Sequence, residues 1–526
     1  MSNYSYPLKP LFLLVFLLIA FFSQAQTQSV RDILEKVAKE KQLELCYSDD
    51  LVALDDSIDW PDNNWETDTI FFKLKETTGY QFQISSGNLM IVPREIRKIR
   101  LSGMIKDAKS GELLPYTNIV VGNTGMGSIS NAIGYFDFKM SDDWTGKELT
   151  FSCMGYHAQK FTIPNDDEEG IIIKLEPKPY NINEIVVLPN GNEARDIVAR
   201  AAKRIKRNGN RRRFQMDAFY RRVSYRDSTV KELLEAALTI KDPGINTSAA
   251  NIKVNLDQYR KSTNYLIPSE ERWAKAFKRM EKYFGGHRNL FYRMLYKDGV
   301  RTIKASWWYE PLEEFEDFKY QVESIEWLDT MKVYKIRYTY DRLYPSGKRA
   351  SELGDDDEGG YIFVNANDYG IMRIDHWWKL GSGKNKSYNL KGVYFSKSSC
   401  VYQKYNGKYY LKYITNLGFP DGKSWIKDDN PDKKKRKIIG RQYNEEMLVI
   451  NNIATERKKM KRIRYREWLD RTENSLETKY EYDSAFWANY NVVKLKPLPE
   501  RAMNELQWEK ALEDQFKENS TTHVED

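Results

Sequence analysis

Four histidines and three cysteines carry most of the reactive side-chain chemistry available to this 526-residue sequence. The histidines lie far apart and form none of the paired spacings that hold zinc in peptidases: His157, His287, His376 and His523. His376 follows Asp375, and a neighbouring carboxylate can orient or charge an imidazole. We nevertheless expect a strand histidine at a sheet edge. The sequence therefore predicts no catalytic, cofactor-binding or metal-binding residue and no cofactor.

The cysteines do not suggest a nucleophile. Cys46, Cys153 and Cys400 lie in strand-like runs, where we expect small buried side chains, and three cysteines cannot form a disulfide framework. No G-x-S-x-G nucleophile elbow is present. Residues 381–384 (GSGK) lack the spacing of a phosphate-binding loop. A hydrolase would need a site assembled from distant residues, and it is the least favoured alternative.

Charged clusters are the remaining candidates for binding. The acidic residues at 166–169 and 355–358 lack the alternating ligand spacing of a calcium loop, so we expect solvated turns. Basic runs occupy residues 203–213, 433–437 and 457–466. They can contact phosphate-rich lipopolysaccharide or another anionic partner, but solvated faces are the favoured interpretation.

The N-terminus has the pattern of an export signal. Lys9 precedes an apolar run at residues 11–22, and small residues, Ser23 and Ala25, stand at the −3 and −1 positions of a cleavage site. A membrane-spanning helix needs about 20 apolar residues, so this run is too short. We predict a signal peptide at residues 1–25 and an exported protein. It would be periplasmic or outer-membrane-associated, neither signal-anchored nor lipidated on cysteine, and without a nucleic-acid partner.

Composition favours strands and reveals an uneven charge. The chain holds 13 Trp, 35 Tyr and 23 Phe, residue types enriched in β-sheets. The net charge of +8 hides an asymmetry, because residues 26–180 carry 17 basic and 25 acidic residues, whereas the later residues carry 65 and 50. This predicts an acidic head and a basic, aromatic body that dock electrostatically or meet different partners.

Residues 27–95 alternate helix and strand signals. A first helix follows Ser29 as its N-cap, with apolar residues at helical spacing: Ile33, Leu34, Val37 and Ala38. A second helix ends at Gly79, and the strands 80–84 and 89–92 form a hairpin. This order, ending in "TTGYQFQ…NLMIV", resembles the secretin and TonB short N-terminal domain. The resemblance implies an α/β module that makes protein contacts in signalling or secretion systems.

Residues 99–176 have the strand and turn spacing of a small β-sandwich. Four apolar residues are expected to fill the space between its sheets: Phe136, Phe138, Leu149 and Phe151. The sequence "LSGMIKDAKSGELLPYTNIVV…GYFDFKM…LTFSCMGYHAQ" resembles the carboxypeptidase regulatory-like domain. The resemblance implies a transthyretin-like accessory sandwich, a spacer or interaction module rather than the zinc peptidase itself.

The remaining chain is long and aromatic. Residues 180–208 are predicted to be a linker strand and helix, although 183–187 also resemble a TonB box. Residues 331–340 alternate as one strand, 406–407 (NG) mark a hairpin turn, and 360–375 predict two strands that resemble the hairpins of lipoprotein-carrier half-barrels. The stretches "FQMDAFYRR" and "YDSAFWANYNVVKLKPLPERAMNELQWEKALEDQF" resemble the C-terminal region of envelope proteins carrying this sandwich.

The predicted fold is multidomain and β-rich. It comprises a small α/β module, a transthyretin-like β-sandwich, a large antiparallel half-barrel of lipoprotein-carrier type and a C-terminal helix. The expected boundaries are 1–25, 27–95, 99–176, 180–208, 210–497 and 499–526, with the last helix at about 499–517.

The predicted function is that of a non-catalytic cell-envelope protein acting through binding or assembly. Its partners would be an envelope protein and an acyl chain or other apolar ligand on the aromatic concave face of the half-barrel. The alternative is an outer-membrane β-barrel related to TonB-dependent receptor systems.

Overall fold

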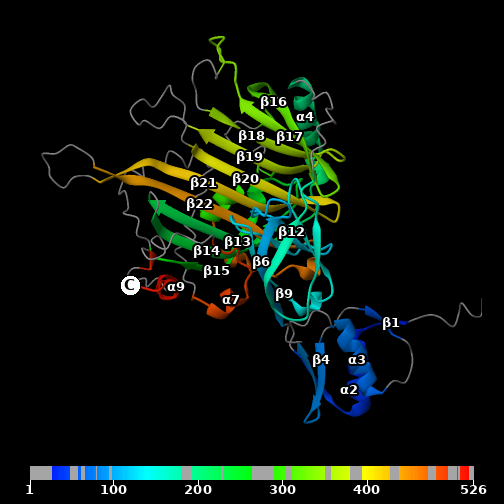
Figure 1. Ribbon diagram of the computed structural model, residues 1–526. Coiled ribbons are helices and arrows are strands. Elements are labelled where there is room, and N and C mark those ends of the chain that lie inside the picture. Colours follow the sequence, from blue (N-terminus) through cyan, green and yellow to red (C-terminus); the bar gives the residue numbers. More distant parts are fainter. Residues whose placement is uncertain are drawn as a thin grey trace, which may run out of the picture. The chain divides into compact units, whose positions relative to one another are not determined.

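A computed structural model describes most of the chain as two compact units, Met1–Arg97 and Lys98–Asp526 (Figure 1). The described residues are 26–47, 57–60, 66–78, 80–93, 97–178, 191–226, 229–263, 289–301, 311–349, 357–379, 394–426, 437–471, 481–495, 506–507 and 510–520. Within these ranges, no helix has the length and apolar character needed to span a membrane. The predicted signal peptide and residues 180–190 of the linker lie outside the described residues.

The first unit is a small α/β module, as the sequence predicts. Its elements are β1 (Gln26–Ser29), α2 (Val30–Lys41), β2 (Glu44–Cys46), β3 (Ser57–Trp60), α3 (Thr67–Thr78), β4 (Tyr80–Ser85) and β5 (Asn88–Pro93). Ser29 caps α2 by accepting a hydrogen bond from the backbone N–H of Asp32. The apolar face of α2 packs with Leu74 of α3 and Leu89 of β5, so the predicted helices and hairpin are confirmed.

The second unit begins with the β-sandwich. Its strands are β6 (Lys98–Asp107), β7 (Asn118–Val121), β8 (Gly127–Ile129), β9 (Tyr135–Ser141), β10 (Glu148–Ser152), β11 (Gln159–Thr162) and β12 (Glu168–Leu175). They form two sheets, ordered β11-β10-β7-β8 and β12-β6-β9. The four predicted core residues, Phe136, Phe138, Leu149 and Phe151, are fully buried between these sheets. Gly103 is required in β6 because a Cβ there would stand 1.9 Å from the carbonyl oxygen of Ile171 in β12.

A ten-stranded antiparallel sheet forms the body of the second unit. Its strands are β13 (Phe214–Arg226), β14 (Thr229–Asp242), β15 (Lys253–Lys261), β16 (Phe318–Leu328), β17 (Met331–Tyr340), β18 (Asp357–Asn365), β19 (Ile371–Lys379), β20 (Tyr394–Tyr405), β21 (Lys408–Ile426) and β22 (Lys437–Ala454). The spatial order is β15-β14-β13-β22-β21-β20-β19-β18-β17-β16. The strand over 331–340, the turn at 406–407 and the strand pair around 365–369 are confirmed.

Two helices, α4 (Gly191–Asn208) and α6 (Leu290–Leu295), cover one face of this sheet, which we call the helix-covered face. Tyr334, Ile336, Tyr338 and Tyr340 of β17 alternate onto this face, as predicted. Phe291 of α6 packs edge-on against Tyr220 of β13, with ring centroids 5.3 Å apart. The aromatic residues of this face therefore form the protein's own core.

The sandwich covers the opposite face, which we call the sandwich face. Ile129 of β8 packs there with Phe219 of β13 and Val449 of β22. The C-terminal elements α7 (Ser484–Asn489) and α9 (Leu512–Ser520) also pack on this half of the sheet, near β13 to β15 (Figure 1). The expected C-terminal helix is present, with different bounds in the described residues: residue 506 is helical, residues 510 and 511 are not, and α9 runs to Ser520. Residues 496–505 lie outside the described residues.

Hydrogen bonds hold the sandwich at two separated places, one on the sheet and one on the segment that follows α7. At the β16–β17 turn, the backbone N–H of Gly155 donates to the carbonyl of Trp327 at 2.7 Å, and the side-chain Nζ of Lys178 donates to the carbonyl of Asp329 at 3.0 Å. At the other place, the side chain of Asn491 donates to and accepts from the backbone of Lys139 in β9, both at 2.7 Å. The sandwich is therefore held at both places and covers the part of the sheet between them.

Replacing Asn491 with alanine is expected to lower the free energy of unfolding by about 1–3 kcal/mol. The substitution leaves the N–H and C=O of Lys139 without partners at an edge strand of the sandwich. Urea denaturation measures the effect, with the exposed Asn246→Ala as the control. Equal stability of the two variants would show that Asn491 does not hold the sandwich.

Candidate functional site

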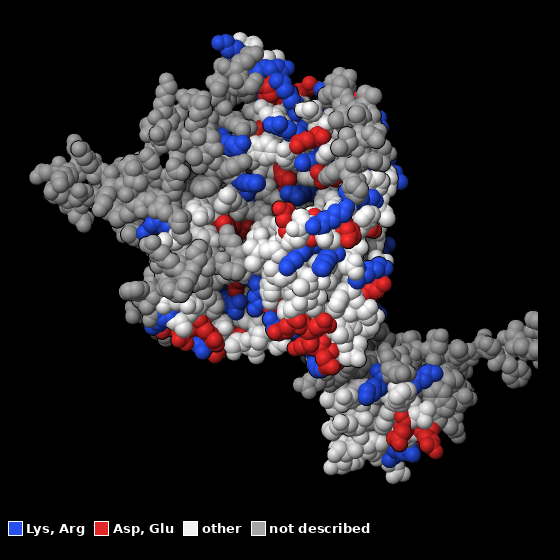
Figure 2. Space-filling model, viewed as in Figure 1, with Lys and Arg blue, Asp and Glu red and all other residues white. Residues whose placement is uncertain are grey.

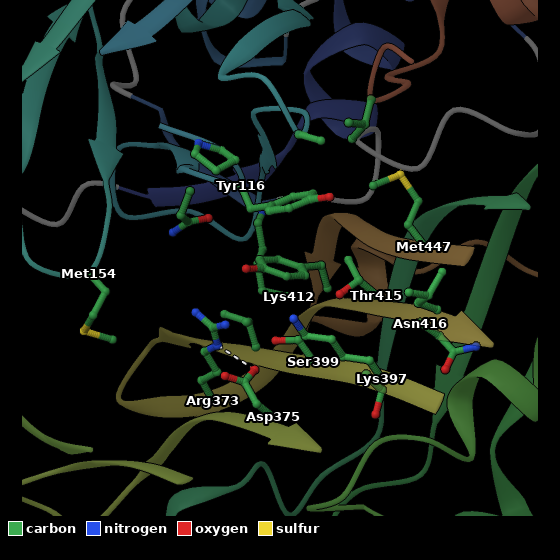
Figure 3. Close-up of a pocket in the computed structure, with 18 of the residues that line it drawn as sticks. Tyr116, Met154, Arg373, Asp375, Lys397, Ser399, Lys412, Thr415, Asn416 and Met447 are labelled. Carbon is green, nitrogen blue, oxygen red and sulfur yellow. Dashed lines mark hydrogen bonds and ion pairs between the residues drawn. The ribbon is translucent and has the colours of Figure 1, made fainter. Parts of the chain in front are cut away.

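A cavity of about 1080 Å³ lies between the sandwich and the sandwich face of the sheet. The sandwich side is lined by Pro115, Tyr116, Asn118, Ser152, Cys153 and Met154. Figure 3 shows Tyr116 and Met154 on this side, and opposite them the strand residues Arg373, Asp375, Lys397, Ser399 and Lys412. Residues 493–495 complete the wall.

Strand register builds the floor of the cavity. Directly paired residues of neighbouring strands project from the same face, so one row of side chains crosses β17, β18, β19, β20, β21 and β22. The row reads Arg337, Tyr361, Asp375, Ser399, Thr415 and Met447. All six residues line the cavity, although they are spread over more than 100 positions of the sequence.

Two parallel rows flank the first. One contains Lys335, Phe363, Arg373, Val401 and Tyr413, and the other contains Gly359, Trp377, Lys397 and Leu417. Gly359 leaves room for the indole of Trp377, since a Cβ at residue 359 would stand 3.3 Å from the ring. Trp377 also packs edge-on against Tyr361, with centroids 5.4 Å apart. The floor thus combines aromatic rings with cationic side chains.

Basic groups outnumber acidic groups around the cavity. Arg373 pairs with Asp375 at 2.7 Å, and the ammonium of Lys335 lies 4.7 Å from the centre of the Tyr361 ring. Arg337 is exposed and makes no hydrogen bond or ion pair with any described residue. Figure 2 shows basic side chains along the margin where the sandwich meets the sheet. The cavity therefore favours an anionic ligand.

Lys412 is a buried lysine in the cavity wall. Its side chain is 1% exposed, and Nζ donates one hydrogen bond to the carbonyl of Ile450 at 3.2 Å. Burial disfavours the charged form and lowers the pKa of Lys412 to about 7. A bulge in the pairing of β20 with β21 next to this residue interrupts the alternation that would otherwise assign it to a face.

Four buried polar atoms of lining residues have no hydrogen-bond partner within the described part of the chain: Asn118 Oδ1, Ser399 Oγ, Gln403 Nε2 and Asn416 Oδ1. An unsatisfied buried polar atom costs about 1–3 kcal/mol. A ligand that offers hydroxyl groups can satisfy such donors and acceptors. The lining therefore offers hydrogen bonds that a purely apolar ligand could not use.

His376 does not belong to this cavity. It lies in β19, between β18 and β20, so the expectation of a sheet edge is wrong. Its ring faces the helix-covered side, with Nδ1 3.1 Å from the hydroxyl of Tyr338 and Nε2 3.6 Å from Glu358 Oε1. Burial, helped by Lys297, lowers the pKa of His376 to about 4.

Asp375 does not orient His376, because successive strand residues point to opposite faces. Its carboxylate pairs with Arg373 on the cavity side instead. In the part of the chain that the structure describes, His376 makes no hydrogen bond to a serine or cysteine. Among the described residues, His376 therefore does not form the nucleophile and base contact of a serine or cysteine hydrolase.

The cysteines differ from one another in environment. Cys400 in β20 is buried, as predicted, and burial raises its pKa. Cys46 is exposed in β2, and Cys153 is half-buried just after β10, so the expectation of buried strand positions is wrong for these two. Cys153 lines the cavity, where burial raises its pKa and suppresses the reactive thiolate.

The structure describes some of the charged clusters expected from the sequence. Residues 166–169 are exposed, and Asp167 and Glu169 bond to Arg100. No metal-binding group of histidine, cysteine, aspartate or glutamate side chains occurs among the residues described. Residues 355–356 and residues 433–436 of the second basic run lie outside the described residues, whereas Glu358 is buried beside His376.

Sequence reasoning missed the cavity itself. Its residues were visible only as parts of separate strands, and the sandwich that roofs it was treated as an independent module. The polar side of each strand could have indicated the cavity. In β17, for example, Lys335 and Arg337 alternate with the aromatic core positions. Joining those polar sides across strands requires the register that only the structure supplies.

Comparisons with known proteins support the sandwich. The family described as CarboxypepD_reg-like domain matches residues 101–187, which confirms that part of the predicted resemblance. No curated protein matches the chain. A LolA superfamily protein from Nitrosomonas europaea is 11% identical, covering 50% of this chain and 93% of that one, with a TM-score of 0.19. A protein of unknown function from Bacteroides fragilis, described as membrane-associated, is 10% identical, with coverages of 68% and 99% and a TM-score of 0.13. At these TM-scores the two likenesses carry no inference.

Proposed function

We propose that this chain is a non-catalytic protein of the cell envelope that binds an anionic, hydroxyl-rich ligand between its sandwich and its ten-stranded sheet. An acidic oligosaccharide is the ligand class that fits. The observation that carries the proposal is a net-basic cavity of about 1080 Å³ whose lining combines hydrogen-bonding groups with aromatic rings. Its volume is at the upper end of ligand pockets, so it suits a ligand larger than one sugar.

The lining supplies each kind of contact that such a ligand needs. Arg337 and Lys397 offer positive charge for carboxylates. Ser399 and Asn118 have buried oxygen atoms without partners and can accept hydrogen bonds from hydroxyl groups. The rings of Trp377 and Tyr361 present amphipathic surfaces for the less polar faces of a sugar.

The sequence suggested an acyl chain as a ligand of the aromatic face. The helix-covered face, which holds these aromatic residues, is less suited to such a ligand. There, Tyr220 and other aromatic residues already pack against α6, and Val198 of α4 belongs to the same core. An acyl chain could enter this core only if the helices moved away. We therefore place the ligand on the sandwich face.

Location and partners belong to the same proposal. The export pattern of residues 1–25 supports passage into the envelope, either the periplasm or the outer membrane. We further propose that the module at residues 27–95 is of the secretin and TonB short N-terminal type and contacts an envelope protein. Its two helices and terminal hairpin support this assignment.

Binding of a galacturonic-acid tetramer tests the proposed ligand class, with a neutral glucose tetramer for comparison. Isothermal titration is expected to show tighter binding of the acidic tetramer. Arg337→Gln is expected to weaken that binding tenfold or more, because a charge-assisted hydrogen bond contributes about 1.5–3 kcal/mol. The control is Lys174→Gln, an exposed position in β12 that does not line the cavity. Equal binding of the two tetramers, or no binding of either, would refute an acidic saccharide.

A further inference from the structure

Two basic runs that are far apart in sequence meet at one end of the ten-stranded sheet. At this end β13 begins, β22 ends, and the β14–β15 and β20–β21 connections turn. The amide of Gln215 exchanges two hydrogen bonds with the backbone of Lys461, at 2.7 and 2.8 Å. Lys408 donates to the carbonyl of Arg207 at 2.7 Å. These contacts join residues 206–213, the β20–β21 turn and residues 457–466 into one surface.

We call this surface the basic end and define it by its exposed or half-exposed cations. They are Lys206, Arg207, Arg211, Arg212, Arg213, Lys241, Lys253, Lys404, Lys408, Arg457, Lys458, Lys459, Lys461, Arg462, Arg464 and Arg466.

Residues 457–466, which carry seven of these cations, belong to a segment with a defined course. After β22 it crosses β13 and β14 and reaches β15, where Leu469 donates to the carbonyl of Val254 at 2.9 Å. Lys461 anchors its middle through ion pairs with Asp217 at 3.2 Å and Asp257 at 3.4 Å. The backbone that carries the neighbouring Arg462 and Arg464 is therefore fixed against the sheet.

The acidic residues at this end are largely neutralised. Glu456 pairs with Lys459 at 2.8 Å, and Asp368 pairs with Lys404 at 2.6 Å. The buried Asp242 pairs with Arg301 at 2.9 Å. Four exposed arginines make no ion pair with any described residue: Arg212, Arg457, Arg462 and Arg466. A strong positive surplus therefore faces solvent.

An exposed aromatic residue stands among these cations. Tyr465 is 85% exposed, and the ammonium of Lys253 lies 4.9 Å from its ring centre. Trp468 lies beside it, with Lys241 5.8 Å from the ring centre. Tyrosine and tryptophan side chains favour the headgroup layer of a bilayer, where a polar edge and an apolar body are both accommodated. A soluble polyanion would need the charges but not the exposed ring.

We propose that the basic end docks the protein onto a membrane surface bearing anionic lipid headgroups, with Tyr465 entering the headgroup layer. Each lysine or arginine near such a surface contributes about 1 kcal/mol, so several together give stable but salt-sensitive association. The contact leaves the cavity between sandwich and sheet free, because the two surfaces share no residue. The inference stands independently of the proposed ligand.

Sedimentation with lipid vesicles tests the proposal on the full chain. One set of vesicles contains phosphatidylcholine alone, and the other contains about one quarter phosphatidylglycerol. The quadruple variant Arg212→Gln, Arg457→Gln, Arg462→Gln and Arg466→Gln is expected to bind the anionic vesicles at least tenfold more weakly. Tyr465→Ala, which leaves the charge unchanged, is expected to bind them about threefold more weakly.

A matched variant removes four exposed lysines elsewhere: Lys36→Gln, Lys39→Gln, Lys109→Gln and Lys174→Gln. It is expected to bind the anionic vesicles as the unaltered chain does. The neutral vesicles measure any contribution of the apolar run at residues 11–22, which all variants share. Unchanged binding of the quadruple variant would overturn the proposal. So would inorganic polyphosphate binding as tightly as the vesicles with no effect of Tyr465→Ala, which would indicate a soluble polyanion.

Discussion

Replacing Glu235 with glutamine is expected to lower the free energy of unfolding by about 3–5 kcal/mol, because the change leaves two arginines uncompensated. Glu235 lies in β14 and is 2% exposed. Its carboxylate accepts hydrogen bonds from Arg221 Nε at 2.6 Å and from Arg260 Nε at 2.7 Å. Burial alone would raise the pKa of Glu235, but the charges and hydrogen bonds of both arginines outweigh it and hold the pKa below its ordinary value.

Guanidinium denaturation measures this effect, and the exposed pair Glu148–Lys160 supplies the control. Glu148→Gln breaks an ion pair of 2.7 Å whose side chains are 54% and 63% exposed. Such a pair contributes about 0–1 kcal/mol. If both variants lost equally little stability, the buried triad would not hold β13, β14 and β15 together.

Replacing Lys412 with methionine is expected to raise the free energy of unfolding at pH 6 by about 2–4 kcal/mol. The pKa of Lys412 falls from 10.5 in the unfolded chain to about 7 in the folded chain, because the ammonium is buried. Each unit of that shift corresponds to about 1.4 kcal/mol. Methionine fills a similar volume without charge, although it leaves the carbonyl of Ile450 without this donor.

The pH dependence gives the same prediction an independent readout. Between pH 7 and 10.5 the unfolded chain holds a proton on residue 412 that the folded chain has released, so stability rises with pH in this interval. Below pH 7 both states are protonated and the full penalty of burying the charge remains. Lys412→Met should reduce this rise, whereas the exposed Lys174→Met should preserve it. A Lys412→Met protein that is less stable and whose stability still rises between pH 7 and 10.5 as in the unaltered chain would contradict the lowered pKa of Lys412.

Local patterns predicted the secondary structure well. Ser29 as N-cap, the alternation of residues 331–340 and the Asn406–Gly407 turn depend on nearest neighbours in sequence, and the structure confirms each. The sandwich was recognisable because its glycines and core phenylalanines occur in a fixed order, and the family match covers 101–187. The last helix was expected at about 499–517, whereas residues 510 and 511 interrupt it and α9 continues to Ser520.

The site was much harder to predict because it depends on long-range pairing. Asp375 and Arg337 become neighbours of the same row only through the register of β17, β18 and β19. Asp375 precedes His376 in the sequence and could have oriented its ring. Successive residues of a strand point to opposite faces, however, so the two side chains do not meet. The two basic runs likewise became one surface only through the contacts of Lys461 and Lys408.

The predicted charge asymmetry has a limited counterpart in the second unit. Lys494 pairs with Asp137 of the sandwich at 3.3 Å, which is an ion pair of the expected sign. Around it, however, the sandwich meets the sheet through apolar packing and backbone hydrogen bonds, such as Ile129 on Val449 and Gly155 on Trp327. The described contacts between sandwich and sheet are therefore mainly apolar packing and hydrogen bonds, and electrostatic docking of head and body stays a prediction.

Native mass spectrometry of the protein purified from its own cells tests the central claim most directly. Ser399→Trp fills the middle of the cavity floor while leaving Arg337 and the basic end in place. We expect the unaltered chain to carry an anionic, carbohydrate-containing species that is absent from the folded Ser399→Trp variant. The same bound species in both proteins, or none in the unaltered one, would contradict a binding site between the sandwich and the sheet.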